Sequence, residues 1–412
     1  MKRPEYAGGA SSRFLLMGTT LFLAIFGLVM IYSASSISAL VKEGSATHFF
    51  VRQLGFVIGG ALLAYAASRF DYRRFQGALG KQVWWMTIGL LLVTYAMGVV
   101  RGGARRWIPL GLFNLQPSEL AKIACILVAA ALAVEWQRGR LEKGGYLRQM
   151  GLYVGVPAVL IVLQPDLGTA VLLAIGVAIV LFLGGIELRW VGFAVVLLVA
   201  FGALGIWMEP YRLERVISSF NPWADAKNSG YQAVQALYAF GTGGLKGVGL
   251  GLSRQKFFYL PEAHTDFIFA IIGEEAGLIG TMAVVGAFGT LLFAGIKIAM
   301  GARDMYGRLI AGAITGMMVF QAVLNMSAVT GIFPITGKPL PFVSYGGSSM
   351  LVTMLCVGLL LSVSEYGARA PRAVRLAPRK EESPRASSDE RRRDSGPRVS
   401  GAHGGRGARR RA

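Results

Sequence analysis

The sequence predicts an all-α polytopic membrane protein with about ten transmembrane helices and both termini in the cytoplasm. Apolar residues make up 54% of the 412 residues and charged residues only 16%, a balance far from that of soluble globular proteins. Apolar runs of roughly 20 residues, the length that crosses a bilayer, recur along the chain. Lys and Arg gather in alternate connecting segments, which places those segments and both termini on the cytoplasmic side.

The predicted spans follow one another with short connections, except before the eighth. They lie at 14–36, 51–68, 82–100, 117–135, 149–164, 167–185, 190–208, 267–299, 307–330 and 346–364. The eighth run is longer than one crossing needs, so we expect a bend or break near Gly273. The first run exceeds the apolar part of a signal peptide and ends without an A-x-A pattern, which indicates a retained span.

The chain divides into three parts. Residues 1–13 form a cytoplasmic N-terminus, 14–366 the transmembrane domain with a large extracellular loop at 209–265, and 367–412 a basic cytoplasmic tail. The tail is rich in Ser, Gly, Pro and Arg, a composition that predicts disorder. Its positive charge favours contact with anionic lipid of the bilayer. Nucleic-acid binding is not expected, because no folded basic module accompanies the tail.

Two cysteines occur in the chain, Cys125 and Cys356, and both fall inside predicted spans. A thiol in such a position is usually a small apolar packing group. We therefore expect neither a redox pair nor a metal site from them.

The connection at 101–122, RGGARRWIPLGLFNLQPSELAK, carries positive charge on the outer side, where the distribution of Lys and Arg does not call for it. Arg105 and Arg106 stand beside a tryptophan, which suits a phosphate-bearing lipid head group, because guanidinium binds phosphate oxygens in a fork. The alternative is that both arginines only reach ordinary phospholipid head groups.

Lys122 lies about one turn inside the fourth span, where an unpaired ammonium costs a few kcal/mol. Glu119, three residues earlier, is the expected partner. The pair is either structural or faces a substrate. QPDLGTA at 164–170 places a further carboxylate, Asp166, at the outer surface in a supporting position.

The long outer loop is patterned. Residues 230–244 predict an interfacial helix with Tyr231, Val234, Leu237 and Tyr238 on one face. Glycines then recur at 241, 243, 244, 247, 249 and 251, but no strand precedes them as nucleotide-binding fingerprints require. We expect a loop that lets a lipid-linked substrate approach the backbone, with positive charge from Lys246, Arg254 and Lys256.

YLPEAHTDFIFAIIGEE at 259–275 places carboxylates around the start of the eighth span. Asp266 either caps the helix, worth about 0.3–1 kcal/mol, or acts as a general base among outer cations in a partly dry setting. Glu274 and Glu275 lie about 12 Å deeper by the rise of a helix. There we expect them to pair internally or to mark a polar cavity, with His264 as a further supporting residue.

The last outer stretch is TGKPLPFVSYGGSS, which ends at residue 349. Pro339 and Pro341 exclude a regular helix. Ser344, Gly346 and Gly347 make a polar, flexible start to the tenth span. They either line the outer cavity or form a purely structural re-entrant turn.

Taken together, these stretches resemble the SEDS family (shape, elongation, division and sporulation). The resemblance spans residues from about 14 to 366 and is carried by GGARRWIPLG (102–111), QPSELAK (116–122), QPDLGTA (164–170), the loop and eighth span at 221–280, and GKPLPFVSYGGSS (337–349). GEE at 273–275 and PITGKPLPFVSYGG favour the FtsW type over the RodA type. Ala236 stands where serine is more usual, which does not touch the charged positions.

The resemblance implies a peptidoglycan glycosyltransferase of the bacterial cytoplasmic membrane, acting on lipid II at the outer face. It also implies a class B penicillin-binding protein as transpeptidase partner, divisome membrane proteins, and septal cell-wall synthesis in cell division. By similarity Asp266 is the catalytic carboxylate of an inverting displacement. The cations expected to take up charge on the pyrophosphate leaving group are Arg105, Arg106 and Lys122, then Arg212, Arg215, Lys246 and Lys256. Gln255 and the glycines would shape the loop.

No cofactor is required by this chemistry. A divalent cation, Mg²⁺ or Mn²⁺, bridging Asp266 and pyrophosphate is compatible with it, but no cluster with ligand spacing predicts a dedicated metal site.

Three other readings stay open. Intramembrane charges could line the path of a lipid II flippase, although they gather on one side and no inverted repeat is apparent. A non-enzymatic scaffold predicts that neutralising Asp266 leaves polymerisation intact. An elongation-type, RodA-like polymerase would share the chemistry and differ in its cellular role.

Overall fold

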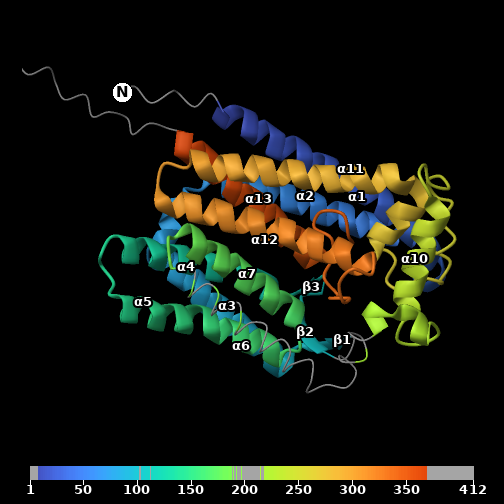
Figure 1. Ribbon diagram of the computed structural model, residues 1–412, viewed down its shortest axis with the longest axis horizontal. Coiled ribbons are helices and arrows are strands. Elements are labelled where there is room, and N and C mark those ends of the chain that lie inside the picture. Colours follow the sequence, from blue (N-terminus) through green and yellow to red (C-terminus); the bar gives the residue numbers. More distant parts are fainter. Residues whose placement is uncertain are drawn as a thin grey trace, which may run out of the picture. The chain divides into compact units, whose positions relative to one another are not determined.

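The computed structural model describes residues 8–101, 104–111, 113–187, 189, 192, 196, 214 and 218–368. The regular secondary structure there is almost entirely helical (Figure 1). The helices are α1 (Gly8–Glu43), α2 (His48–Arg69), α3 (Ala78–Met97), α4 (Pro117–Gln137), α5 (Lys143–Met150), α6 (Val156–Leu163), α7 (Leu167–Leu183), α10 (Tyr231–Gly243), α11 (Ile268–Gly301), α12 (Met305–Val329) and α13 (Gly347–Ala368).

A helical segment covers each predicted span in the described part of the chain. Seven helical segments are long and apolar enough to cross a membrane, and α5 and α6 form one of them, Lys143–Leu163, through a π-helical turn at Gly151–Gly155. The shorter apolar helix α7 and the 20-residue α3 fall on two further predicted spans. The seventh predicted span, 190–208, and the tail at 367–412, apart from the last turn of α13, lie outside the described residues.

The two ends of the transmembrane domain lie on the same side, as predicted. Figure 1 shows α1 beginning and α13 ending at one end of the helices. Glu365 near the end of α13 pairs there with Arg13 at 3.3 Å and with Arg69 at 3.7 Å. The opposite end, called here the α10 end, carries α10 and the strands (Figure 1).

Helix α4 forms the centre of the described core. It contacts α3, α7 and α12, and nearly nine-tenths of its most apolar stretch is buried, against less than one-fifth for α2. Its many alanines allow this, because small side chains let neighbouring helices approach closely. On the facing helix α7, a Cβ added to Gly176 would lie 2.8 Å from the Ile126 side chain of α4. The region around Lys122 is therefore inaccessible to bulk water.

A small antiparallel sheet stands where the sequence analysis expected only a loop. Its strands are β1 (Val99–Arg101), β2 (Ala104–Pro109) and β3 (Asn114–Leu115), in the order β1-β2-β3. Helix α3 ends before it, with Gly98 as C-cap residue. Trp107 and Ile108 in ARRWIP are residue types that are enriched in strands, and the pairing with β1 and β3 completes the sheet.

The eighth span is broken as expected, and the break lies at Gly277, about one turn beyond Gly273. Gly277 has φ +64° and ψ −161° inside α11, a conformation that is essentially restricted to glycine. Gly273 is helical and serves another purpose. A Cβ there would lie 2.3 Å from the Phe240 ring of α10, so its lack of a side chain allows the two helices to meet.

The predicted interfacial helix exists as α10, but a different face is buried. The buried residues are Ala233, Val234, Ala236, Ala239 and Gly243, whereas Tyr238 of the predicted apolar face is 50% exposed. Small residues of α10 face α11, because the backbones of these two helices lie very close together. A Cβ on Gly243 would lie 1.9 Å from the Gly273 carbonyl oxygen.

Candidate functional site

Asp266 lies at the α10 end, two residues before the first residue of α11. Phe267 occupies the N-cap position, so Asp266 precedes the capping residue, which weakens the reading of Asp266 as a helix cap. Asp266 is half-buried and lines a small cavity together with Asn325, Gly337 and Lys338. A Cβ added to Gly337 would lie 3.7 Å from Asp266 Oδ2, so the carboxylate lies over the backbone of this segment.

The second site carboxylate, Asp166, is buried beside that cavity segment. Its Oδ1 lies 2.6 Å from Lys338 Nζ, and both side chains are no more than 3% exposed. Asp166 is also the N-cap residue of α7 and accepts hydrogen bonds from four groups: the Thr169 backbone N–H (3.2 Å) and hydroxyl (2.7 Å), Gln116 Nε2 (2.9 Å) and Ser118 Oγ (3.1 Å). These bonds compensate the desolvation of a buried charge.

The two arginines of β2 differ in their surroundings. The Arg106 guanidinium donates to the backbone carbonyls of Gln164 (3.3 Å) and Pro165, which lie directly before Asp166. Arg105, the next residue on the strand, is exposed. The structure therefore brings GGARRW and QPDLG together, and leaves Arg105 open to solvent at the α10 end.

Glu119 and Lys122 form the expected ion pair inside α4. The Lys122 ammonium lies 3.0 Å from Glu119 Oε2, and both side chains are almost fully buried. Lys122 Nζ also donates to Gln321 Oε1 (3.0 Å), and Gln321 Nε2 donates to the Pro339 carbonyl (3.0 Å). The pair thus supports the segment that forms the Asp266 cavity.

The glycine-rich loop packs against the break in α11. The break leaves four backbone groups of α11 without helical partners, and each bonds to the loop. The carbonyls of Glu274 and Glu275 accept from the N–H groups of Val248 (2.9 Å) and Gly249 (3.1 Å). The N–H groups of Leu278 and Ile279 donate to the carbonyls of Gly244 (2.9 Å) and Leu245 (3.3 Å). Gly244, Gly247, Gly249 and Gly251 all have positive φ. These four backbone groups of the loop are engaged with α11, so a substrate that approached the loop would meet its other backbone groups.

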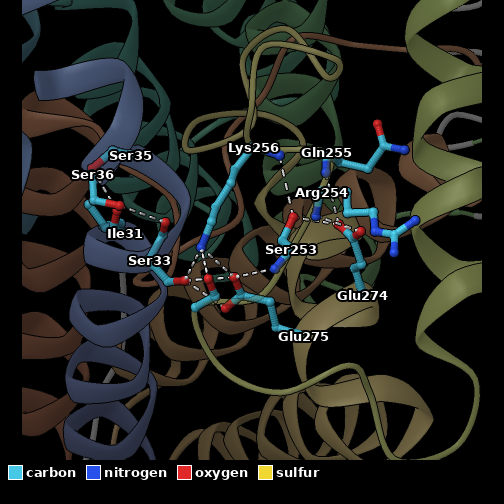
Figure 2. Close-up of polar contacts among 11 residues, drawn as sticks. Ile31, Ser33, Ser35, Ser36, Ser253, Arg254, Gln255, Lys256, Glu274 and Glu275 are labelled. Atoms are coloured by element: carbon cyan, nitrogen blue, oxygen red, sulfur yellow. Dashed lines mark hydrogen bonds and ion pairs between the residues drawn. The ribbon is translucent and has the colours of Figure 1, made fainter. Parts of the chain in front are cut away.

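Two carboxylates of α11 hold the next part of the loop (Figure 2). Glu274 accepts from the Ser253 hydroxyl and from the backbone N–H groups of Arg254 (2.9 Å) and Gln255 (3.3 Å). Glu275 lies 3.2 Å from Lys256 Nζ and accepts from the Ser33 hydroxyl of α1 at 2.7 Å. The Lys256 ammonium also donates to the Gly251 carbonyl (2.5 Å). Figure 2 shows these groups pointing toward one another between α1, the loop and α11.

The remaining cations and amides of the predicted site are dispersed. Lys246 and Arg254 are exposed on the loop, while Gln255 is buried and its Oε1 has no hydrogen-bond partner within the described residues. Arg212 and Arg215 lie outside the described residues. Lys256 differs from the expectation of a substrate-facing cation, because its charge is buried against Glu275.

The start of α13 is a tightly bonded turn. Ser344 Oγ accepts from the Leu340 N–H (2.8 Å), and Gly346 N–H donates to Gln53 Oε1 of α2 (3.2 Å). A Cβ on Gly347 would lie 2.6 Å from the Phe56 ring. These contacts favour the structural reading of Ser344, Gly346 and Gly347.

His264 packs into the same turn. Its ring centroid lies 4.7 Å from that of Phe49, and its carbonyl accepts from the Tyr345 N–H at 3.0 Å. Burial lowers the pKa of His264, and nearby Lys42 adds to this, while Glu262 opposes it. The imidazole is therefore neutral at pH 7 and acts in packing.

Sequence reasoning missed two residues of the Asp266 cavity, Lys338 and Asn325. Lys338 was visible as a lone cation in an outer stretch of prolines and glycines. Asn325 was visible as an amide near the outer end of an apolar span, where polar groups need a partner. Neither pattern specifies which carboxylate or carbonyl the side chain meets, because those partners lie far away in sequence.

No group of three or more His, Cys, Asp or Glu side chains in the described part of the chain is arranged to hold a metal ion. Cys125 and Cys356 are both buried and unbonded to each other, which agrees with their expected packing role.

Comparison with known proteins identifies the family. Residues 13–369 match the family model described as "Cell cycle protein", which covers FtsW, RodA and SpoVE. The chain is 40% identical to stage V sporulation protein E of Bacillus subtilis over 356 residues, covering 85% of this chain and 96% of that protein. It is 41% identical over 345 residues to the probable peptidoglycan glycosyltransferase FtsW of Geobacter metallireducens, covering 83% and 92% of the two chains.

Solved structures of similar fold support the same family. A chain from a peptidoglycan synthase complex, described as coordinating polymerization and crosslinking, superposes with a TM-score of 0.70 at 28% identity, covering 86% of this chain and 98% of that one. RodA of Thermus thermophilus superposes with a TM-score of 0.64 at 28% identity, covering 86% and 97%. The chain belongs to the FtsW, RodA and SpoVE family of cell cycle proteins, the SEDS family.

Proposed function

We propose that the protein is a peptidoglycan glycosyltransferase that polymerises lipid II into glycan strands at the outer face of the bacterial cytoplasmic membrane. The observation that carries the proposal is the family match over residues 13–369, which includes the whole described transmembrane domain. Relatives named as probable peptidoglycan glycosyltransferases FtsW support it. We assign the α10 end to the outer face, because the opposite end carries the Lys and Arg-rich connections.

Septal cell-wall synthesis in cell division is the cellular role we prefer, since the name FtsW recurs among the relatives. The proposed partner is a class B penicillin-binding protein acting as transpeptidase. A structural neighbour from a complex that coordinates polymerization and crosslinking supports such a partner.

Asp266 is the proposed general base. The GlcNAc 4-hydroxyl of the acceptor attacks the MurNAc anomeric carbon, and its proton passes to the Asp266 carboxylate. The new C–O bond forms as the bond to polyprenyl pyrophosphate breaks, with the electron pair leaving on the pyrophosphate oxygen. A single inverting displacement needs one base and no nucleophile pair. Half-burial beside a narrow cavity suits this role, because a general base must lie within hydrogen-bond reach of the proton that it takes.

Charge on the departing pyrophosphate requires cations that a substrate can reach. Arg105 on β2 and Lys246 and Arg254 on the glycine-rich loop are exposed and are our candidates among the described residues. Arg106 is already bonded to two backbone carbonyls and Lys122 is paired with Glu119. We therefore assign both residues to supporting the cavity. A divalent cation arriving with the pyrophosphate would be compatible with this arrangement.

The test is polymerisation of labelled lipid II by the purified protein, alone and with its class B partner, comparing the native protein with Asp266→Asn. Asp266→Asn keeps the size of the side chain and removes the base. We expect glycan strands from the native protein and a loss of at least about a hundredfold in the variant, within the range that general bases contribute.

Equal strand formation by both proteins would remove Asp266 from the mechanism. If neither makes strands with the partner present, while lipid II crosses vesicles that contain the native protein, the flippase reading replaces the proposal.

A further inference from the structure

Asn325 of α12 joins Asp266 to the segment that carries Lys338. Its Nδ2 group donates to the Asp266 carbonyl at 2.8 Å and to the Lys338 carbonyl at 2.8 Å. One carboxamide thus bonds two backbone segments that are more than 70 residues apart. Asn325 is 3% exposed, so water does not compete for these bonds.

The orientation of this carboxamide is set by its partners. Both carbonyls accept hydrogen bonds and only the NH₂ group of asparagine can donate, so the reverse orientation would place Oδ1 against two oxygens. In the observed orientation Oδ1 is buried and has no hydrogen-bond partner within the described residues. An unsatisfied buried acceptor costs roughly 1–3 kcal/mol. An apolar side chain of similar size would avoid that cost but could not make either bond.

Both bonded segments line the same cavity. Asp266, Asn325, Thr336, Gly337 and Lys338 are among its lining residues, and its volume is only about 10 Å³. That is near the lower limit for holding one water molecule. The walls are therefore close together, and a change in the separation of the two segments changes the position of the Asp266 carboxylate over Gly337.

The Lys338 segment is itself held on its far side. Lys338 Nζ lies 2.6 Å from Asp166, and the residues after Lys338 continue into the turn at Gly346 that is bonded to α2. On the Asp266 side, α11 begins two residues later at Ile268, and the Tyr345 N–H donates to the His264 carbonyl at 3.0 Å. The Asn325 bond adds a direct attachment at the Asp266 carbonyl itself. The Asn325 carboxamide transmits the position of the Lys338 segment to Asp266.

We propose that Asn325 is a positioning residue for the polymerase reaction, whose carboxamide holds the backbone of the base Asp266 against the anchored Lys338 segment. The inference rests on the proposed function, since it assigns Asn325 a role through Asp266. Misplacement of a reacting group by about 1 Å can cost roughly a hundredfold in rate. Asn325 acts on turnover and not on binding, because its amide faces backbone carbonyls of the protein.

The test compares the full-length protein with Asn325→Leu, which keeps the number and branching of the side-chain heavy atoms and removes both bonds. Asn325→Ser is the second variant in case leucine prevents folding. Thr315→Val, on the same helix, is the matched control: Thr315 Oγ1 is also buried without a partner in the described residues, and it lies away from the cavity. Two quantities are measured, amide hydrogen exchange over 260–268 and 335–341, and lipid II polymerisation as kcat and KM.

We expect exchange in both segments to rise at least about tenfold in the Asn325 variants, with kcat lower by about 10- to 100-fold and KM within about twofold. Thr315→Val should resemble the native protein in both respects. Unchanged exchange, a preserved kcat, or a loss confined to KM would each overturn the proposal. An equal loss of kcat in Thr315→Val would do so as well.

The exchange measurement separates this proposal from the assigned reaction. If the native protein makes no glycan strands, the proposed function fails and the inference falls with it as a statement about catalysis. Faster exchange in the Asn325 variants would still establish that the carboxamide holds the two segments together.

Discussion

The ammonium group of Lys338 lies 2.6 Å from Oδ1 of Asp166, and neither side chain is accessible to solvent. The two residues belong to different outer stretches, one before α13 and one at the N-terminus of α7. Their contact joins the GKPLP and QPDLG stretches into one structure beside Asp266. A buried ion pair of this kind is costly to form, but even more costly to break on one side.

Removing the charge of one member of this pair should therefore lower the stability of the protein more than removing both charges. We expect Lys338→Met and Asp166→Asn each to lower the thermal stability of the purified protein. The double variant should recover part of the loss, with a coupling free energy of about 1–3 kcal/mol. The measurement is a double-mutant cycle of unfolding in detergent.

The exposed pair Lys143–Glu187, with the same kind of ion pair at 3.0 Å, is the control. Its coupling should stay below about 1 kcal/mol because solvent screens it. Additive effects at Lys338 and Asp166 would show that the buried pair does not join the two stretches.

The second prediction concerns Lys256 and Glu275, which connect the glycine-rich loop to α11. Lys256→Met leaves the Glu275 charge buried with only neutral donors, and we expect a loss of about 3–5 kcal/mol. Lys246→Met, at an exposed position of the same loop, should change stability by less than about 0.5 kcal/mol. Thermal unfolding of both variants in the same detergent measures the difference. Similar midpoints for the two variants would contradict the ion-pair role.

The third prediction concerns the break in α11. Gly277→Ala places a Cβ 2.4 Å from the Gly247 backbone nitrogen in a conformation that only glycine adopts readily. We expect a clear loss of folded protein. Gly286→Ala, nine residues further along α11, has open space around its Cβ and should be neutral or stabilising by up to about 1 kcal/mol. Yield and unfolding midpoint compare the two. A tolerated alanine at 277 would mean that α11 can be continuous.

The fourth prediction concerns pH and the cluster between α11 and α12. Asp304 caps α12 and accepts from Tyr72 (2.5 Å) and Arg73 (2.9 Å). Burial opposes ionisation of Asp304, but hydrogen bonds from Tyr72, Gly307 and Arg73 outweigh it and lower its pKa. A lowered pKa means that the carboxylate stabilises the fold above its unfolded value of about 4 and that this contribution is lost as pH falls through the folded value.

Asp304→Asn should therefore be less stable than the native protein at pH 7, and the difference should shrink as the pH falls below about 4. Unfolding midpoints between pH 7 and pH 3 measure it. A difference that stays constant across this range would exclude a contribution from the ionised carboxylate.

Much of the fold follows from local composition. The length and apolar character of each run located nine described spans, and the distribution of Lys and Arg placed the two ends of the domain on one side. The predicted position of a helix break is less accurate where a glycine causes the break. The sequence offers several glycines around the eighth span, and nothing local distinguishes Gly273, which allows a close helix contact, from Gly277, which breaks the helix.

The sheet and the buried face of α10 were missed for a related reason. β2 is stabilised by pairing with β1 and β3, and α10 buries alanines because its backbone lies against α11. Both outcomes depend on neighbours that hydrophobic periodicity does not identify.

By itself, the sequence determined the membrane class, the order of the charged stretches between the spans and the candidacy of Asp266, because these depend on residue type and order. Only the tertiary structure decided which charges are engaged. Lys122, Lys256 and Arg106 are all candidates from the sequence for binding pyrophosphate, yet each is engaged by a partner inside the protein, while Arg105 and Lys246 stay exposed. Pairing depends on contacts between residues far apart in the chain, and only folding creates those contacts.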